Sequence, residues 1–244
     1  MEFCNNQKFK SKEVAKTEIK NLNPNVSVDC VVFGFDNSKL NVLLIEQKLQ
    51  DKGKIQLALP GDLILNDEGL DEAANRVLKE ITQLEGIFLK QFHSFGDPVR
   101  VQDIKDLEWL QSFRENPQAR VITVAYFALV KMGDFEPEAS GFAERVFWCD
   151  IKKVPSLAFD HDSILSQAWE RLKGDFEYKK TGFELLPEKF TLSQVQKLYE
   201  IILDKELDKR NFRKKILKEN LVSPTNEKQK GVLHKPAMLY EIKT

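Results

Sequence analysis

The amino-acid sequence predicts an α+β protein with two folded parts. Strand-like segments crowd between residues 26 and 148 around one strongly amphipathic helix. Two short helices joined by a tight turn follow near residue 200, and a hairpin-like pair of segments ends the chain. A chain of 244 residues is long enough for two small domains. We therefore expect a sheet domain followed by a helical domain that carries a β-hairpin.

The composition is typical of a folded protein without a membrane-spanning segment. The chain is 42% hydrophobic and 31% charged, and its longest apolar stretches have the length of a strand. The three cysteines, Cys4, Cys30 and Cys149, form no CxxC pair, and the first residues lack the features of a secretory signal. These observations predict a cytoplasmic protein with no membrane partner, no metal site and no cofactor.

The charge is distributed unevenly along the chain. Residues 191–244 hold twelve Lys and Arg against seven Asp and Glu, a net charge of +5, so residues 1–190 carry −6 of the overall −1. A basic C-terminal quarter is typical of a region that meets a polyanion, although a solvated basic tail would give the same count.

Five segments of the first part have the residue pattern of strands. Residues 26–33 are rich in β-branched side chains, and turn residues at 36–38 lead into a second run at 40–45, which predicts a hairpin. A third short run covers 57–59. Residues 121–130 are apolar nearly throughout, which predicts a central strand, and 145–148 form a further strand.

Two helices are predicted among these strands. Residues 70–84 place a set of apolar side chains on one face at helical spacing, namely Leu70, Ala73, Ala74, Val77, Leu78 and Ile81. Residues 163–172 form a second helix. The polar stretch between His93 and Arg120 is interpreted as a helical insertion over the sheet.

The segment from Leu59 to Leu84 resembles the Nudix box, the loop-helix-loop G-x5-E-x7-R-E-U-x-E-E-x-G-U, in which U is a bulky aliphatic residue. When Leu59-Pro60-Gly61 is set against the Leu-Pro-Gly that usually precedes the box, several positions match at once. The matching residues are Glu68, Arg76, Leu78, Glu80 and Leu84.

The departures from this motif concern its chemistry. Active Nudix enzymes hold Mg²⁺ or Mn²⁺ with the glutamates of R-E-U-x-E-E, and here two of these three positions are Val77 and Ile81. The first and last glycines of the box are Asp62 and Gln83. Because pyrophosphate hydrolysis needs the metal, we predict a catalytically inactive domain, with Glu68 and Arg76 forming a structural ion pair.

A fold that has lost its chemistry can still bind a ligand. Residues 92–100 resemble the segment that borders the ligand cleft in ADP-ribose-handling Nudix proteins, so the candidate ligand contacts are Arg100, Arg120, Glu68 and Glu80. For Arg100 and Arg120, a solvated loop residue is an equally good interpretation. His161 is expected to cap or orient the helix that follows it rather than bind a ligand.

The C-terminal part has the pattern of a helix-turn-helix with a wing. Thr191 and Gln194 form a capping box before a helix with apolar residues at Val195, Leu198, Tyr199 and Ile202. Asp208 caps a second helix, whose expected buried side is Phe212, Ile216 and Leu217. The residues expected to contact DNA are Lys209, Arg210, Asn211, Arg213 and Lys214 on this helix and Lys228, Lys230 and Lys235 on the hairpin.

Together these features resemble the Nudix-related transcriptional regulators of the NrtR and AraR type. The resemblance implies an arm at 1–22, an α/β/α Nudix sensor at 23–155 and, at 156–244, a linker helix with a winged helix-turn-helix domain. It also implies a homodimer on a palindromic double-stranded DNA operator. A sugar, sugar phosphate or ADP-ribose-like effector would change DNA binding at genes of sugar or NAD/ADP-ribose metabolism.

Two other functions are compatible with the same residues. One is an active Nudix hydrolase of the ADP-ribose pyrophosphatase type, against which Val77 and Ile81 argue. The other is an inactive binding module whose C-terminal domain contacts only proteins.

Overall fold

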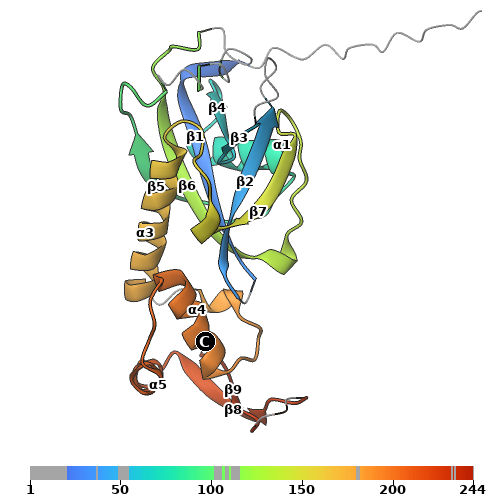
Figure 1. Ribbon diagram of the computed structural model, residues 1–244, viewed down its shortest axis with the longest axis vertical. Coiled ribbons are helices and arrows are strands. Elements are labelled where there is room, and N and C mark those ends of the chain that lie inside the picture. Colours follow the sequence, from blue (N-terminus) through green and yellow to red (C-terminus); the bar gives the residue numbers. More distant parts are fainter. Residues whose placement is uncertain are drawn as a thin grey trace, which may run out of the picture.

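A mixed β-sheet forms the larger part of the molecule (Figure 1). In the part of the chain that is described, seven strands belong to it, with a central path in the order β3-β2-β1-β6-β5. β1 pairs in parallel with β6 and antiparallel with β2, while β4 pairs with β1 and β7 with β2. Their bounds are β1 Leu22–Phe35, β2 Leu40–Lys48, β3 Ile55–Ala58, β4 Gly61–Leu65, β5 Lys90–Phe95, β6 Ile122–Lys131 and β7 Arg145–Asp150.

The structure is a computed structural model, and it describes most but not all of the chain. The described residues are 21–36, 38–48, 55–101, 106–107, 110, 116–179, 182–231, 233 and 235–243. The predicted arm at 1–22 and the predicted insertion between residues 101 and 118 therefore lie mostly outside them.

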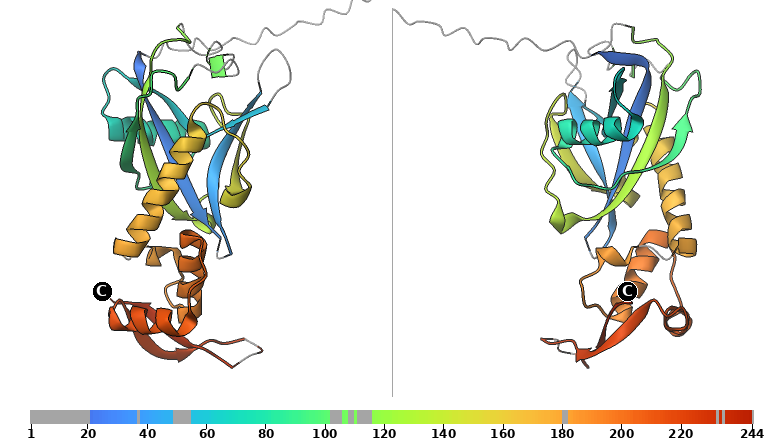
Figure 2. Two further views of the ribbon diagram at one scale, coloured as in Figure 1. Left: turned by 60° about the vertical axis from the view of Figure 1, so that its left-hand side comes forward. Right: turned by 180° about the vertical axis from the view of Figure 1, so that it is seen from behind.

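Two helices cover opposite faces of the sheet, which confirms the predicted α/β/α arrangement (Figures 1 and 2). Successive side chains of a strand point to opposite faces. Cys30 and Val32 of β1 therefore pack under α1 (Leu70–Thr82), while Val31 and Phe33 pack under α3 (His161–Lys179). The sheet is apolar on both faces because it has a helix on each.

Most predicted elements of this domain are confirmed, with differences at their ends. α1 ends at Thr82 rather than Leu84, because Gln83 adopts a left-handed conformation with φ 58°. α3 is longer than the predicted helix at 163–172. The short strands β4 and β5 were not predicted, since β5 has exposed residues such as His93 among its buried ones.

The C-terminal domain contains the predicted winged helix. Its helices are α4 (Leu192–Leu203) and α5 (Lys209–Lys218), and its hairpin is formed by β8 (Val222–Lys228) and β9 (Met238–Ile242). Thr191 caps α4 through the predicted capping box, and the Asp208 side chain accepts a hydrogen bond from the Asn211 N–H at 2.8 Å.

Across both domains, short 3-10 helices cover Met132–Asp134, Ile151–Lys153 and Phe183–Leu185.

One expected buried residue of α5 is exposed. Phe212 and Ile216 face α4 and are buried as predicted, but the prediction for Leu217 is wrong, since it is 47% exposed. Leu217 lies about 100° around the helix from Ile216, which turns it away from the domain core.

The two domains share one hydrophobic core. The apolar side chains on the α3 face of the sheet belong to one hydrophobic cluster with Phe176 of α3. The same cluster extends into the winged helix and includes Phe190, Leu198 and Ile216. Trp169 of α3 donates a hydrogen bond from Nε1 to the carbonyl oxygen of Ile202 at 3.1 Å. α3 therefore runs from the sheet domain onto α4, as both views in Figure 2 show. No described helix is long and apolar enough to cross a membrane.

The cap of α4 gives a first test of this architecture. Replacing Thr191 by Ala removes the side-chain acceptor for the Gln194 N–H and should lower the free energy of unfolding by about 1 kcal/mol. Urea denaturation would show this as a lower midpoint with an unchanged m value. Thr191→Ser keeps the hydroxyl and should stay close to the unchanged protein. An equal loss in both variants would contradict the assigned cap.

Candidate functional site

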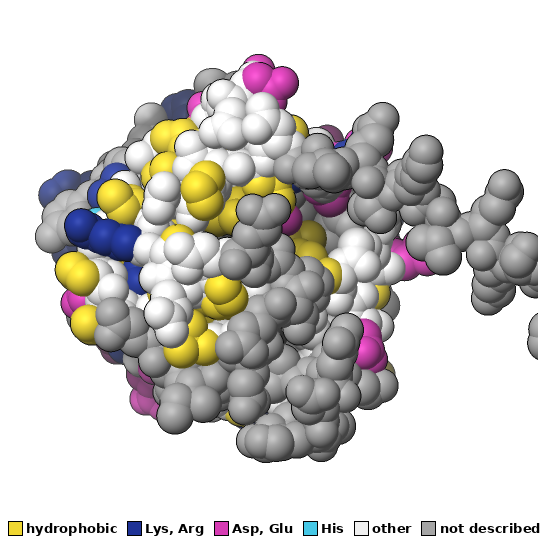
Figure 3. Space-filling model, turned by 90° about the horizontal axis from the view of Figure 1, so that it is seen from above, with side chains coloured by type: hydrophobic (Ala, Val, Ile, Leu, Met, Phe, Trp, Pro, Cys, Tyr) yellow, Lys and Arg dark blue, Asp and Glu magenta, His cyan; other side chains and the backbone are white. Residues whose placement is uncertain are grey.

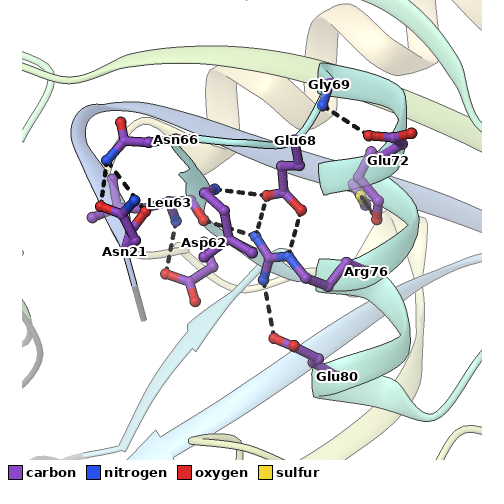
Figure 4. Close-up of polar contacts among 12 residues, drawn as sticks. Asn21, Asp62, Leu63, Asn66, Glu68, Gly69, Glu72, Arg76 and Glu80 are labelled. Atoms are coloured by element: carbon purple, nitrogen blue, oxygen red, sulfur yellow. Dashed lines mark hydrogen bonds and ion pairs between the residues drawn. The ribbon is translucent and has the colours of Figure 1, made fainter. Parts of the chain in front are cut away.

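The Nudix box region is held together by Arg76 (Figure 4). The guanidinium donates two hydrogen bonds to Glu68, at 2.8 Å from Nε and 2.6 Å from a terminal nitrogen, and a third to Glu80 at 3.0 Å. It also donates to the carbonyl oxygen of Leu63 at 3.1 Å, which ties the helix to β4. The hydrogen bonds that Arg76 donates to Glu68 raise the pKa of Arg76 above its ordinary value. The predicted structural ion pair of Glu68 and Arg76 is confirmed.

The positions of the two missing glutamates lie inside the protein. Val77 is 0% exposed and Ile81 is 2% exposed, and both belong to the core between α1 and the sheet. On this side of α1, Tyr126 donates a hydrogen bond to Asp71 at 2.6 Å. The described residues contain no group of three His, Cys, Asp or Glu side chains that could hold a metal ion. The residues present do not fit the metal site of an active Nudix enzyme.

A pocket opens at the end of the sheet domain farthest from the winged helix. Figure 3 looks onto this end, where hydrophobic side chains gather around a hollow. Its apolar walls include Leu59, Phe142 and Phe159. Phe159 has φ 57°, which is rare for an aromatic residue and costs about 1–3 kcal/mol. Strain of this kind is found where the surrounding structure holds a functional geometry.

The polar end of this pocket is a buried network centred on Arg100. Its guanidinium forms a bidentate pair with Asp160, at 2.9 and 2.6 Å, and donates to the hydroxyl of Thr123 at 2.8 Å. A terminal nitrogen of Arg100 also lies 3.8 Å from Asp29. The Arg100 side chain is only 4% exposed, so the interpretation as a solvated loop residue is wrong.

Asp29 of β1 completes the network from the floor of the pocket. It lies 3.4 Å from Nε2 of His161, while Nδ1 of His161 accepts a hydrogen bond from the Leu59 N–H at 3.0 Å. Burial alone would raise the pKa of Asp29, but His161, Arg100 and Thr123 together lower it below its ordinary value. Asp29 is therefore a buried carboxylate that stays ionised at neutral pH.

The close approach of Asp29 explains why a glycine precedes the box. A Cβ atom added at Gly61 would lie 1.8 Å from the Asp29 carboxylate oxygen. The Leu-Pro-Gly segment thus lets β4 lie directly against the floor of the pocket.

Of the four predicted ligand contacts, the structure places only Arg100 in the lining of this pocket. Arg100 lines the pocket, but Arg120 lies outside its lining and donates to the carbonyl oxygen of Gly96 at 3.0 Å. Glu68 and Glu80 bracket Arg76 and do not line the pocket. Sequence reasoning missed Asp29 and Asp160. A carboxylate in the middle of an apolar strand was the available signal for Asp29.

His161 does not act as a cap. It is the first residue of α3, and its ring contacts Leu59 and Asp29, so it anchors the start of the helix to the sheet, which agrees with the orienting half of the expectation. The residue is buried because it forms part of the pocket wall.

The predicted DNA-contacting residues fall on more than one face of the winged helix. Lys209, Arg210 and Lys214 are exposed on α5; of these, Arg210 and Lys214 lie opposite the buried Phe212 and Ile216, whereas Lys209 lies at the start of the helix. Asn211 lies on another flank, where it lines a concavity with Phe176 and Lys215. Lys228 ends β8, and the exposed Lys230 and Lys235 lie in the connection to β9, as expected for a wing.

A groove joins α5 to the wing. Lys209 and Arg213 of α5 line it together with Lys235 of the wing and Lys197 of α4, a basic residue that the sequence analysis did not single out. Arg213 is half-buried there and donates to the Ser193 hydroxyl at 3.1 Å. Arg213 is therefore turned toward α4, whereas Arg210 and Lys214 point outward.

Restoring the glutamates of the box should damage the fold. Val77→Glu and Ile81→Glu would each bury a carboxylate without a partner, and we expect the free energy of unfolding to fall by about 3 kcal/mol or more. Lys79→Glu, on the exposed side of the same helix, is the matched control and should cost far less. Chemical denaturation measures the difference. A stable variant with Mg²⁺-dependent ADP-ribose hydrolysis would contradict this account of α1.

Two family profiles match the chain in the order of its two domains. The NUDIX domain matches residues 23–168, and the NrtR DNA-binding winged helix domain matches residues 182–242. The ADP-ribose pyrophosphatase of Methanocaldococcus jannaschii is 26% identical over 164 residues, which cover 65% of this chain and 83% of that protein.

Two further relatives extend over both domains. The ADPR responsive transcriptional repressor NtrR of Acinetobacter baylyi is 31% identical over 221 residues, which cover 89% of this chain and 81% of the relative. The crystal structure of Shewanella oneidensis NrtR complexed with a 27mer DNA superposes with a TM-score of 0.63 at 26% identity, covering 89% of this chain and 93% of that chain. The chain therefore belongs to the NrtR family of transcriptional regulators, which join a Nudix domain to a DNA-binding winged helix domain.

Proposed function

We propose that this protein is a repressor whose affinity for DNA changes when ADP-ribose binds in the Nudix pocket. The effector is suggested by the Acinetobacter baylyi relative, which is described as ADPR-responsive. The sensor comprises residues 23–155, and residues 156–244 comprise the linker helix with the winged helix domain. The observation that supports the proposal best is that α3 contacts both the pocket and the DNA-binding domain.

The N-terminal end of α3 belongs to the pocket. His161, its first residue, lies in the pocket wall, and the preceding Asp160 is held by Arg100. A ligand that shifts this network also shifts the start of the helix. A ligand shifts the equilibrium between two forms of a protein only if it interacts differently with them. The effector must therefore contact this network differently in the DNA-binding and DNA-free forms.

The other end of α3 belongs to the winged helix. Besides the hydrogen bond from Trp169 to Ile202, the ring of Phe176 packs edge-on against Tyr199 with 5.5 Å between centroids. Tyr199 in turn packs against Phe212 of α5 at 5.4 Å. A displacement of α3 therefore reaches α5 through two ring contacts. An ion pair of Lys152 with Asp204 forms a second link between the domains.

The regulator acts without hydrolysing its effector. Val77 and Ile81 remove two of the three helix carboxylates that a Nudix metal site needs, and Glu80 is engaged by Arg76. The alternative, an active hydrolase, is favoured only by the likeness to an ADP-ribose pyrophosphatase. Steady release of AMP from ADP-ribose in the presence of Mg²⁺ would establish it.

On DNA we propose a cytoplasmic homodimer on a palindromic operator. Two copies of α5 would enter successive major grooves, about one turn of DNA apart. The target genes would belong to sugar or NAD/ADP-ribose metabolism, and a sugar or sugar phosphate remains the alternative effector class.

The exposed face of α5 is tested by removing single cations. Arg210→Ala should weaken binding to the DNA upstream of its own gene about 5- to 150-fold, since one lost base contact is worth about 1–3 kcal/mol. Lys214→Ala should weaken binding to all sequences and reduce the salt slope by about one. Gel-shift titrations at several salt concentrations measure both. Lys79→Ala removes an exposed charge from the Nudix domain and should change neither. DNA binding that survives loss of both cations would reject α5 as the recognition helix.

The role of α3 is tested by uncoupling its far end. Trp169→Phe removes the hydrogen bond to Ile202 and keeps an aromatic ring, so ADP-ribose should still bind with unchanged affinity. We expect ADP-ribose to change operator affinity about two- to thirtyfold less than in the unchanged protein, in line with coupling changes of about 0.5–2 kcal/mol. Calorimetry gives the ligand affinity and gel shifts give the coupling. Trp148→Phe in β7 is the matched control. Full coupling in the Trp169 variant would rule out this route.

A further inference from the structure

We infer that the polar end of the Nudix pocket receives an uncharged, hydroxyl-bearing part of the effector, a ribose ring, and leaves phosphate groups outside. The inference rests on the proposed function only in taking this pocket as the effector site. It assigns Asp29 as the group that accepts hydrogen bonds from the ligand and Arg100 as a positioning residue.

Arg100 is not available as a phosphate anchor. Nε and one terminal nitrogen bind Asp160, and the other terminal nitrogen binds Thr123. The charge of the guanidinium is already met by Asp160 and by Asp29 at 3.8 Å. A phosphate that took Arg100 would have to leave the half-buried Asp160 or the buried Asp29 without its partner, which is costly in a low-dielectric interior.

His161 is also engaged on both sides of its ring. Its Nδ1 accepts the hydrogen bond of the Leu59 N–H at 3.0 Å, and its Nε2 faces the Asp29 carboxylate at 3.4 Å. A phosphate that took His161 would have to displace one of these two contacts, so His161 orients Asp29 rather than anchoring an anion.

The start of α3 is not an anion site. The N–H groups of His161, Ser163 and Ile164 donate to the carbonyl oxygens of Ala158 and Asp160, at 3.2, 2.9 and 3.1 Å. The carboxylates of Asp160 and Asp162 also lie at this end of the helix, where they offset the positive end of its dipole.

The carboxylates at the polar end of the pocket favour a ligand that donates hydrogen bonds from hydroxyl groups. Among the described residues at this end, Asp29 and Asp160 share the guanidinium of Arg100, and a third carboxylate, that of Asp62, also lines the pocket, so carboxylates outnumber the guanidinium. This repels a phosphate group and attracts the hydroxyl groups of a sugar, which carboxylates bind in other nucleotide sites. The adjacent walls of Leu59, Phe142 and Phe159 fit the apolar face of a ring.

Competition on the unchanged protein tests this without any variant. Calorimetry would measure ADP-ribose binding in the presence of adenosine, D-ribose or inorganic pyrophosphate. We expect adenosine or D-ribose to compete and pyrophosphate to have no effect. Competition by pyrophosphate, or no binding of either ribose-containing probe, would overturn the inference. Failure of ADP-ribose itself to bind would reject the proposed effector, whereas direct titrations of adenosine, D-ribose and pyrophosphate still test the pocket.

The sign of a charge change gives a second test. Asp29→Asn keeps the shape of the side chain but removes its charge. If the group accepts ligand hydroxyls, affinity for ADP-ribose should fall about tenfold or more; if phosphate lies here, affinity should rise. Asp62→Asn makes the same change at another point of the lining. If the Asp29 variant fails to fold, the Asp62 variant shows whether removing a negative charge lowers or raises the affinity for ADP-ribose. Glu85→Gln, on an exposed side chain away from the pocket, should leave affinity unchanged.

Discussion

The ion pair between Arg100 and Asp160 is the interaction on which the pocket and its connection to the DNA-binding domain depend. Arg100 follows β5, Asp160 immediately precedes α3, and Thr123 and Asp29 hold the guanidinium from two neighbouring strands. Because Asp29 and Asp160 share this one guanidinium, removing Arg100 would leave two carboxylates without their cation, so the four segments are held in one arrangement. The start of α3 is thereby fixed to the sheet.

The Nudix helix keeps its place on the sheet although two metal-binding positions of its motif hold apolar residues. Arg76 still ties α1 to the preceding loop through Glu68 and Leu63, which is a structural task. At Val77 and Ile81 the helix packs on the sheet with apolar side chains, and burial of such side chains stabilises the fold where unpaired carboxylates would destabilise it. The two positions that carry glutamates in the motif thus contribute to core packing in this chain.

Much of the fold could be predicted because it depends on local patterns. The apolar face of α1, the capping box at Thr191, the cap at Asp208 and the continuous apolar run of β6 each lie within a few residues of chain. The site could be predicted less well. The burial of Leu217 was wrongly predicted, and the burial of Arg100 and the contacts of His161 could not be predicted, because exposure and partners depend on segments distant in sequence.

The sequence by itself determined the two domains, the loss of the metal-binding carboxylates and the basic character of the second C-terminal helix, since residue identity and spacing are sufficient for each. Only the tertiary structure decided that Asp29, Arg100, Asp160 and His161 meet in one pocket and that α3 connects this pocket to α4. These residues lie up to about 130 positions apart. Their meeting depends on the parallel pairing of β1 with β6 and on a core shared by both domains, which no local pattern specifies.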